Sequence, residues 1–575
     1  MSDTRRDREA LFARPHADVL IIGGGINGLA TFRDLALQGV DVALVERNDF
    51  VSGASAASSH MIHGGIRYLE NGEFRLVHEA VTERNSLLRS APHVVRPLQT
   101  TIPIFSTLSG LLSAPLRFLR HRSSRPRERG AALIKIGLVI YDSFSRGRGQ
   151  RRVENVPRHA FHGRRRSLRE LPRLNPRVKY TATYWDASLH DPERLAIDVL
   201  RDGRAAGGGR ARAVNYLAAV GSRGAKVLLR DVETAEEIEF TAPVVVNASG
   251  PWVDLTNAAL GQATEYMGGT KGSHIVLDNP QLRDATAGRE LFFEHEDGRV
   301  VLIYPLKGRV LVGTTDIEHH MSDPVVCTDE EVDYFFDLIR HVFPDVTVDT
   351  SEIVYRFAGV RPLPGHGDLA PGFVSRDYRI ESQRLGDPAG GTTVLSLIGG
   401  KWTTFRASAE HLADRVLTIL GAPRICSTQG MPIGGGRGFP RTERERARWV
   451  SAHALRLPPE RVGRLLDRYG TVAAGFIDAI AADPEDTLLS SLPAFSSTEL
   501  RHLVSTEDVV HLDDLLVRRS SIAFTGAATD EVIEEIARVI GPDLGWDEER
   551  RGQELARVRA IVPSPPRGRC ASRAA

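Results

Sequence analysis

The chain has 575 residues, which is too long for one hydrophobic core, so two or three domains are expected. Hydrophobic residues make up 42% and charged residues 26%, which is typical of a folded globular protein and excludes a fibrous or wholly disordered chain. The net charge is only +1, and three isolated cysteines argue against a disulfide framework or a zinc site and for a reducing compartment.

Residues 1–16 are polar and rich in arginine, and we expect them to form an N-terminal tail. They lack the apolar stretch of a secretory signal. The chain also contains no run of eighteen apolar residues, so the sequence predicts no membrane-spanning helix.

A dinucleotide-binding unit is indicated directly after this tail. Residues 19–22 are an apolar run typical of a buried parallel strand. Gly23, Gly25 and Gly28 follow at G-x-G-x-x-G spacing and lead into a helix expected at 29–38. The first glycine permits a tight turn, the second lets the backbone approach a pyrophosphate, and the third lets helix and strand pack closely.

A second strand, expected at 40–45, ends in Glu46, whose carboxylate can accept hydrogen bonds from an adenosine ribose. The order strand, glycine turn, helix, strand and terminal acid is much more specific than the glycines alone. The sequence therefore predicts a dinucleotide site.

Small and hydroxyl-bearing residues follow the second strand. Ser55, Ser58 and Ser59 can donate hydrogen bonds where the phosphates or ring of a cofactor lie close to the backbone. The segment continues through His63 to Arg67, which can hold a phosphate by a bidentate contact.

A surface helix is expected at 74–88, and an arginine-rich region follows it. Residues 117–177 contain eighteen Lys or Arg against four Asp or Glu. Apolar clusters alternate with arginines over 108–144, a pattern that suits a helix lying in a membrane interface. An anionic partner is one interpretation, and a solvated pair of helices packed on the body of the protein is the other.

Further strands and turns carry the remaining candidate residues. A buried strand expected at 241–246 runs into a small-residue turn with Ser249 and Gly250, a second place for the cofactor. A turn over 268–273 leads into a strand with His274 at its mouth. Paired strands expected at 299–305 and 310–314 are followed by Asp316, and prolines place Arg361 on a rigid turn.

A second strand–glycine–helix unit follows near residue 400. The strand is expected at 392–398, Gly399 and Gly400 form the turn, and a helix runs through Leu420. A second helix N-terminus is thereby directed at a ligand. Beyond a glycine-rich linker at 434–438 the pattern is helical. We expect one dinucleotide-binding and substrate domain at 17–430, a helical domain at 431–560 and a disordered tail at 561–575.

Seven segments together resemble the FAD-dependent glycerol-3-phosphate dehydrogenases, in the order found in that family. They are IIGGGINGLA, SSHMIHGGIRYLE, NASGPWVD, KGSHIVL, VGTTDIE, AGVRPLP and IGGKWTTFR. The likeness extends from Asp18 to about Phe524, and HLDDLLVRRSSIAF is similar to the family's C-terminal cap domain. His60 and Trp402 depart from the family pattern, where lysine and an aliphatic residue are usual.

The resemblance implies an α/β fold in which a Rossmann-like FAD-binding domain is interleaved with a mixed-sheet substrate domain, followed by an all-helical cap. It implies oxidation of sn-glycerol 3-phosphate to dihydroxyacetone phosphate, with electrons passed to a membrane quinone. No metal is required, because the flavin is the electron sink. The expected location is cytoplasmic, peripheral on the inner face of the cell membrane, with an anionic membrane surface contacting the 117–177 region.

This chemistry assigns roles to the candidate residues. His274 is the first choice for the base that takes the hydroxyl proton and His63 the second, because histidine titrates near neutral pH. Arg361 would stabilise the developing alkoxide. The phosphate anchor is expected to comprise Arg67, Tyr68, Lys401 and Thr403. Asp316 either orients the loop or ligand, or caps a turn.

Three alternatives remain at this point. A soluble oxidase would use oxygen and release hydrogen peroxide, and an amino-acid or amine oxidase would use its arginine to hold a carboxylate. A nucleic-acid binder using the arginine-rich region is disfavoured, because that region lacks interleaved aromatic residues. The sequence is compatible with a homodimer and with a monomer.

Overall fold

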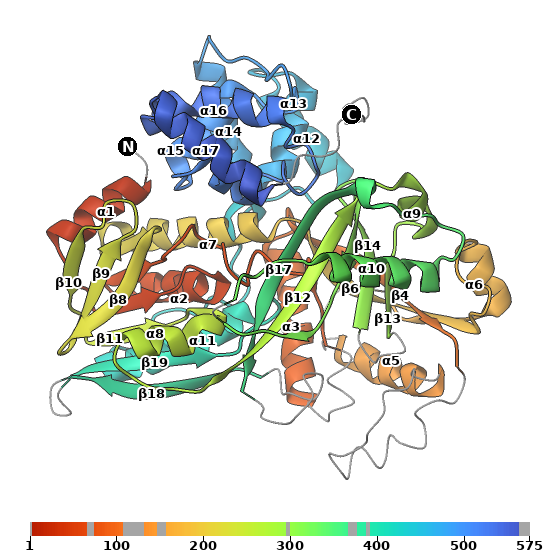
Figure 1. Ribbon diagram of the computed structural model, residues 1–575, viewed down its shortest axis with the longest axis horizontal. Helices are drawn as coiled ribbons and strands as arrows, with labels where there is room; N and C mark the ends of the chain where they lie inside the picture. Colours follow the sequence, from red (N-terminus) through yellow and green to blue (C-terminus); the bar gives the residue numbers. More distant parts are fainter. Residues whose placement is uncertain are drawn as a thin grey trace.

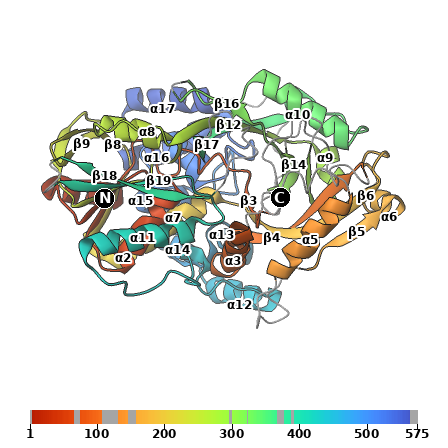
Figure 2. The same cartoon turned by 90° about the horizontal axis from the view of Figure 1, so that it is seen from below.

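The computed structural model describes residues 3–65, 74–106, 131–145, 157–294, 300–321, 323–365, 377–386 and 391–562. Arg67 and Tyr68, residues 117–130 and 146–156 of the arginine-rich region, and residues 563–575 of the tail predicted at 561–575 lie outside these ranges. Three parts make up the molecule: a six-stranded sheet with its helices, a ten-stranded sheet beside it, and a helical domain against both (Figure 1, Figure 2).

The six-stranded sheet has the order β18-β19-β11-β1-β2-β7. Its strands are β1 (Val19–Ile22), β2 (Val42–Val45), β7 (Ala211–Val214), β11 (Val244–Asn247), β18 (Arg379–Leu385) and β19 (Thr392–Ile398). All neighbours are parallel except β18 and β19. All four residues of β1 are buried, as expected for a central parallel strand covered on both faces.

The two faces of this sheet have different covers. Val19 and Ile21 belong to a core shared with helices α2 (Ile26–Leu37), α7 (Pro192–Gly207) and α11 (Phe405–Leu420). Leu20 and Ile22 pack instead with the small antiparallel sheet of β8 (Leu217–Arg223), β9 (Lys226–Asp231) and β10 (Glu237–Phe240). Alternate side chains of one strand thus enter two separate cores.

Residues 1–16, expected to form a tail, contain a helix instead. Helix α1 (Asp3–Ala13) buries Leu11 completely, and Asp7 is 5% exposed. The Asp7 carboxylate accepts hydrogen bonds from Arg204 Nε at 2.8 Å and from the backbone N–H of Ala213 at 3.0 Å. These contacts fix the helix against α7 and β7 despite its polar composition.

The ten-stranded sheet carries the substrate half of the molecule. Its main path is β16-β12-β15-β14-β13-β4-β6-β3, with β17 paired to β12 and β5 to β6. The strands are β3 (Met61–Ile62), β4 (Val95–Ile104), β5 (Ala160–Gly163), β6 (Tyr180–Leu189), β12 (Met267–Leu277), β13 (Glu290–Glu294), β14 (Val300–Leu306), β15 (Arg309–Gly313), β16 (Ile317–Glu318) and β17 (Ile353–Pro364). Because strands of the two sheets alternate along the chain, the two halves are interleaved, as predicted.

Two site residues lie within strands, whereas the sequence predicts Arg361 on a turn and His274 at the start of a strand. Arg361 is in β17, which runs antiparallel to β12 from Pro364 opposite Met267 to Ile353 opposite Leu277. Among the strands that the structure describes, β17 pairs with β12 alone, and a proline is tolerated on such an edge. His274 lies well inside β12, because the glycine-rich stretch before it is extended as well.

Helices cover the outside of the second half. Helix α10 (Asp329–Val342) packs on one face of the ten-stranded sheet through Phe335 and Ile339. The remaining helices of this half are α3 (Phe74–Ser90), α5 (Ala131–Ser145), α6 (Arg164–Glu170) and α9 (Pro280–Ala285), whereas α8 (Val253–Ala259) packs against β8, β11 and β19 of the six-stranded half. Helix α3, predicted at the surface, buries one face that includes Glu83 and Arg84. In the described part of the chain, no helix is long and apolar enough to cross a membrane.

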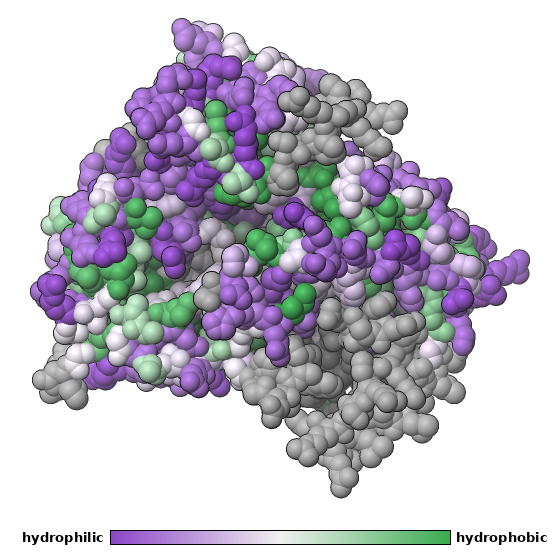
Figure 3. Space-filling model, viewed as in Figure 1, coloured by the Kyte–Doolittle hydropathy of each residue, from purple (hydrophilic) through white to green (hydrophobic). Residues whose placement is uncertain are grey.

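The C-terminal part is a helical domain with its own core. It contains α12 (Glu443–His453), α13 (Pro459–Tyr469), α14 (Ala473–Ala482), α15 (Ser497–Thr506), the π-helical segment η8 (Asp514–Arg519), α16 (Asp530–Leu544) and α17 (Glu548–Ile561). Short 3₁₀ turns occur at η2 (Gly208–Arg210), η3 (Gly250–Trp252), η4 (Thr350–Glu352), η6 (Gly434–Gly436) and η7 (Gly470–Val472). On the face shown in Figure 3, hydrophilic side chains dominate the outer surface of this domain.

Buried ion pairs join the helical domain to the six-stranded half. Asp49, which follows β2, accepts hydrogen bonds from Arg518 at 2.5 Å and from Arg519 at 2.7 and 2.9 Å. Arg194 on α7 forms a bidentate pair with Glu507, at 2.5 and 2.6 Å. All five side chains are at most 9% exposed.

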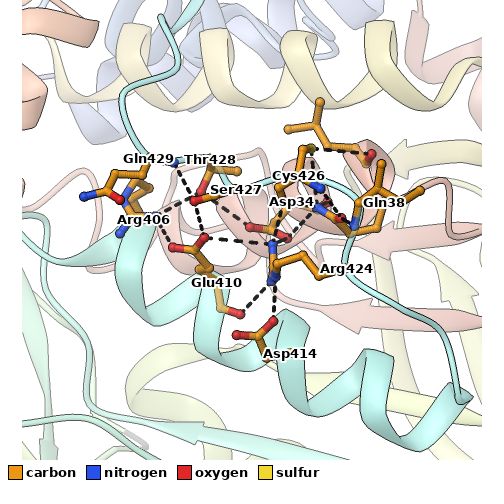
Figure 4. A network of polar contacts seen from close by, with 12 residues as sticks. Asp34, Gln38, Arg406, Glu410, Asp414, Arg424, Cys426, Ser427, Thr428 and Gln429 are labelled. Carbon is orange, nitrogen blue, oxygen red and sulfur yellow. Dashed lines mark hydrogen bonds and ion pairs between the residues drawn. The ribbon is translucent and has the colours of Figure 1, made fainter.

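The segment leading from α11 towards the helical domain crosses α2 and is held there by polar contacts (Figure 4). Asp34 on α2 accepts a hydrogen bond from Arg424 at 2.9 Å, and Gln38 donates to the backbone oxygen of Cys426 at 3.0 Å. Arg424 also pairs with Asp414 on α11 at 2.6 Å. The connection between the two domains is therefore anchored rather than free.

Candidate active site

The carboxyl ends of three adjacent parallel strands, β1, β11 and β19, meet at one edge of the six-stranded sheet. Each is followed by small residues, and ligands of open α/β sheets bind at this kind of edge. Gly23 has a φ of +116°, and a Cβ there would lie 2.6 Å from the backbone oxygen of Ala248. A Cβ on Gly28 would lie 2.0 Å from the backbone oxygen of Gly23. Both positions therefore require glycine.

The N-terminus of α2 has the features of a phosphate-binding site. Its N-cap, Gly25, has no side chain to cap the helix, and the Ile26 N–H donates to Ser55 Oγ at 3.0 Å. Glu46 at the end of β2 accepts from the backbone N–H groups of Gly24 at 2.7 Å and Asn48 at 2.9 Å. Burial raises the pKa of Glu46, and these two hydrogen bonds oppose the rise. This donor set and the glycine cradle fit the diphosphate and ribose of FAD.

The second glycine turn faces the first. Gly399 and Gly400 have φ values of +86° and +104°, and a Cβ on Gly400 would lie 2.5 Å from Asn27 Nδ2 on α2. Trp402 Nε1 donates to the backbone oxygen of Ser55 at 3.0 Å. The tryptophan that departs from the family pattern thus joins the second turn to Ser55, whose hydroxyl contacts the start of α2, and the α2 and α11 units converge on one region.

Remaining candidate residues lie around these turns. Thr403 Oγ1 donates to the backbone oxygen of His63 at 3.1 Å, so Thr403 lies beside the second histidine candidate. Ser58 Oγ accepts from the His60 N–H at 3.1 Å. Ser249 Oγ donates to Asn247 Oδ1 at 2.6 Å, and Gly250 has a φ of +63°. Arg67 and Tyr68 lie outside the described residues.

A cavity of about 90 Å³ lies between the ten-stranded sheet and the segment after β2. Ser59, Gly272, His274, Gly359 and Arg361 are among the residues that line it. A Cβ on Gly272 would lie 2.3 Å from Arg361 Nη2, and one on Gly359 would lie 2.3 Å from the Cβ of Ala57. The two glycines therefore let the arginine and the serine-rich segment close around this space.

His274 is held tightly at the cavity. It is 3% exposed, its Nε2 lies 2.8 Å from Ser59 Oγ, and its ring stacks on Phe357 with centroids 4.9 Å apart. Burial, with the charges of Arg361 and His60, lowers the pKa of His274 to about 3. The imidazole is therefore neutral near pH 7 and has a nitrogen able to accept a proton. Among the described residues, its Nδ1 has no hydrogen-bond partner.

Arg361 is oriented by the turn after β15. Its Nη1 donates to Asp316 Oδ1 at 2.8 Å, and its Nη2 donates to Thr314 Oγ1 at 2.9 Å and to the backbone oxygen of Thr315 at 2.8 Å. The Arg361 side chain is 23% exposed and lines the cavity, so part of it is available to a ligand. The Asp316 carboxylate, for which an orienting role and a turn-capping role were both open, contacts this guanidinium.

The sequence-based candidates missed a polar cluster behind this turn. Glu331 on α10 contacts Lys271, Ser273 and Thr315, all at most 7% exposed. Its sequence signal is Thr328-x-x-Glu331, a capping box that opens α10. That pattern predicts a helix start and does not indicate what else the glutamate contacts. The described residues contain no group of three or more His, Cys, Asp or Glu able to hold a metal ion.

Comparisons with known proteins agree with this geometry. Residues 18–415 match the family described as FAD dependent oxidoreductase, and residues 426–551 match the C-terminal domain of alpha-glycerophosphate oxidase. A glycerol-3-phosphate dehydrogenase of Synechocystis sp. is 31% identical over 95% of this chain and 96% of its own length. A D-erythritol 1-phosphate dehydrogenase of Brucella abortus is 30% identical over 88% of this chain and 94% of its own.

A solved structure shows the same fold. The glycerol-3-phosphate dehydrogenase of Bacillus halodurans complexed with FAD aligns over 99% of both chains, with a TM-score of 0.74 and 23% identity. The predicted α/β fold with a helical C-terminal domain and the predicted FAD cofactor are both confirmed. The chain belongs to the FAD-dependent glycerol-3-phosphate dehydrogenase family.

Proposed function

We propose that the protein oxidises sn-glycerol 3-phosphate to dihydroxyacetone phosphate and passes the electrons on to a membrane quinone. The observation that carries this proposal is the pairing of a buried neutral histidine, His274, with a partly exposed arginine, Arg361, at one cavity. Bound at the edge of the six-stranded sheet, FAD supplies the hydride acceptor.

The two side chains have different roles at the substrate's secondary alcohol. His274 is the candidate base for the hydroxyl proton, and Ser59 Oγ, 2.8 Å from its Nε2, orients the ring. Arg361 stabilises the developing alkoxide, and Asp316 holds its guanidinium in place. His63 is the second candidate for the base.

The phosphate of the substrate is assigned to Lys401 and Thr403, together with Arg67 and Tyr68. Lys401 and Thr403 lie in the turn that opens α11, so the dipole of that helix adds to the positive potential. Holding the phosphate fixes the reacting carbon relative to His274, and this orientation contributes to the rate.

We extend the proposal to the membrane. The described part of the arginine-rich region includes α5, on which Ile136 and Val139 are more than half exposed and Lys135 is exposed as well. An apolar helix face with basic flanks suits an anionic bilayer surface, in keeping with a quinone acceptor and a place on the inner face of the cell membrane. A homodimer is compatible with this arrangement.

The test is an anaerobic titration of the purified holoenzyme, following the visible absorption of its flavin. We expect stoichiometric bleaching by sn-glycerol 3-phosphate and none by glycerol or amino acids. Since one relative is named for D-erythritol 1-phosphate, that compound is the second substrate to add. Stronger bleaching by it would replace the substrate in this proposal. Reoxidation by oxygen as fast as by a soluble quinone would favour an oxidase.

A further inference from the structure

A buried polar cluster lies on the opposite face of β12 from the cavity. Gly272 and His274 line the cavity, whereas Lys271 and Ser273 at the alternate positions contact Glu331 on α10. This alternation follows from the strand geometry, in which successive side chains point to opposite faces. Glu331 is 3% exposed, so the whole cluster is inside the protein.

The Glu331 carboxylate accepts four hydrogen bonds. Its Oε2 accepts from Lys271 Nζ at 2.9 Å and from the Thr328 N–H at 2.9 Å. Its Oε1 accepts from Ser273 Oγ at 2.8 Å and from Thr315 Oγ1 at 2.6 Å. Burial opposes ionisation, but these donors outweigh it and hold the pKa of Glu331 below its ordinary 4.5. The carboxylate is therefore ionised and fully satisfied at neutral pH.

Only half of these contacts are needed to cap a helix. The capping box uses Oε2 and the Thr328 backbone, and Lys271 balances the charge. Oε1 instead contacts Ser273, the residue before His274, and Thr315, in the turn that holds Arg361. A role limited to capping α10 leaves these two hydrogen bonds without an explanation.

Thr315 connects the carboxylate to the arginine. Its hydroxyl accepts from the Ser273 N–H at 2.9 Å and donates to Glu331, while its backbone oxygen accepts from Arg361 Nη2 at 2.8 Å. The residues on either side, Thr314 and Asp316, and the backbone oxygen of Lys271 accept further hydrogen bonds from the same guanidinium. A fixed Thr315 side chain therefore helps to fix the turn 314–316, which supplies hydrogen-bond acceptors to the guanidinium.

We propose that Glu331 is a positioning residue for the reaction, holding Arg361 through Thr315 and the strand position next to His274 through Ser273. This inference rests on the proposed function, because it takes Arg361 and His274 as the groups that contact the substrate. Glu331 itself does not line the cavity.

Glu331→Gln tests the inference in the full-length holoenzyme. The amide oxygen can still face Lys271 and the Thr328 N–H, which turns the NH₂ group towards Thr315 and leaves the threonine hydroxyl without its acceptor. Glu330→Gln is the matched control, since it removes the same charge from the neighbouring, exposed position of the same helix turn. Thr315→Val removes only the linking hydroxyl, and Thr315→Ser keeps it.

The measurements are flavin content, melting temperature, and kcat and KM for sn-glycerol 3-phosphate. We expect Glu331→Gln and Thr315→Val to keep their flavin and to lose roughly 10- to 100-fold in kcat, because small displacements of an orienting group are costly. KM should stay within about 3-fold of wild type, since Arg361 acts on charge that develops in the transition state. Thr315→Ser and Glu330→Gln should stay close to wild type.

A double variant separates one pathway from two independent effects. If Glu331 acts through Thr315, the pair Glu331→Gln and Thr315→Val should lose no more than about 3-fold beyond the worse single variant. Unchanged kcat in both single variants, or loss in Thr315→Ser equal to that in Thr315→Val, would overturn the inference alone. If Glu331→Gln loses its flavin, the kcat of Thr315→Val, compared with that of wild type and of Thr315→Ser, tests the inference instead. A wild-type flavin that sn-glycerol 3-phosphate does not reduce would overturn the proposed function and this inference together.

Discussion

Two buried carboxylates on opposite halves of the molecule behave in opposite ways. Asp34 on α2 and Glu331 on α10 are 0% and 3% exposed, and each has a cationic partner at 2.9 Å. Burial raises the pKa of Asp34 from 3.8 to about 6, although Arg424 opposes the rise. The pKa of Glu331 lies below its ordinary value. Burial and one ion pair therefore do not determine the charge state.

The difference lies in the remaining donors. Glu331 has three more within 2.6–2.9 Å. Asp34 has only Gln38 at 3.3 Å and Thr428 at 3.5 Å, and Glu410 nearby adds a like charge (Figure 4). Short hydrogen bonds to the charged form compensate for its lost hydration, and long ones do not. The site half of the molecule thus holds its buried charge more firmly than the connecting segment does.

Replacing each carboxylate by leucine should give the largest contrast. Glu331→Leu leaves Lys271, which is 7% exposed, without its counter-ion, and should cost about 3–5 kcal/mol of unfolding free energy. Asp34→Leu leaves Arg424, which is 22% exposed and retains Asp414, and it also removes a charge that burial disfavours, so it should cost no more than about 1 kcal/mol. Denaturant unfolding of both variants measures the difference, and equal losses would contradict this account.

The pH dependence of stability should have the opposite sign at the two positions. The folded-state pKa of Asp34 is raised, so this group destabilises the fold as pH rises from about 4 to 6 and adds nothing further above that interval. The interval from 3.8 to about 6 corresponds to about 3 kcal/mol. Asp34→Asn, which cannot ionise, should be more stable than wild type at pH 7 and show a flatter profile between pH 4 and 6. A profile as steep as that of wild type would contradict the raised pKa.

Glu331→Gln should have the reverse effect. The pKa of Glu331 is lowered, so its contribution is present above the unfolded value of 4.5 and is lost as pH falls through the folded value. We expect the variant to be less stable than wild type by about 1–2 kcal/mol at pH 7 and to approach it in acid. Urea unfolding at a series of pH values measures this, and a constant difference down to pH 3 would argue against an ionised Glu331.

Asp414→Asn should have the smallest effect. Asp414 pairs with Arg424 at 2.6 Å, but its side chain is 51% exposed. Solvent screens such a pair, so we expect a change within about 0.5 kcal/mol. This variant is the control for Asp34→Leu, because both remove a partner of Arg424. A loss of unfolding free energy as large as that of Asp34→Leu would show that the exposed pair of Arg424 with Asp414 contributes as much as the buried one.

The sequence predicted the cofactor half better than the substrate half. Gly23 and Gly28 require close backbone contacts and nothing larger fits, so their spacing alone indicates the turn. Arg361 was placed on a turn because prolines usually end strands, and only the pairing with β12 shows that β17 is an edge where they fit. Glu331 was visible as a helix cap, but its contacts with Thr315 and Ser273 depend on long-range packing, which local patterns do not encode.

The buried pairs between Asp49 and the helical domain impose an order on the making of this protein. Arg518 lies 469 residues after Asp49 in the chain. At typical rates of synthesis, on the order of half a minute to a minute and a half separates the emergence of the two from the ribosome. Until then Asp49, three residues after Glu46, lacks both of these arginine partners. The first domain therefore gains its full stability only after the C-terminal helices have been synthesised.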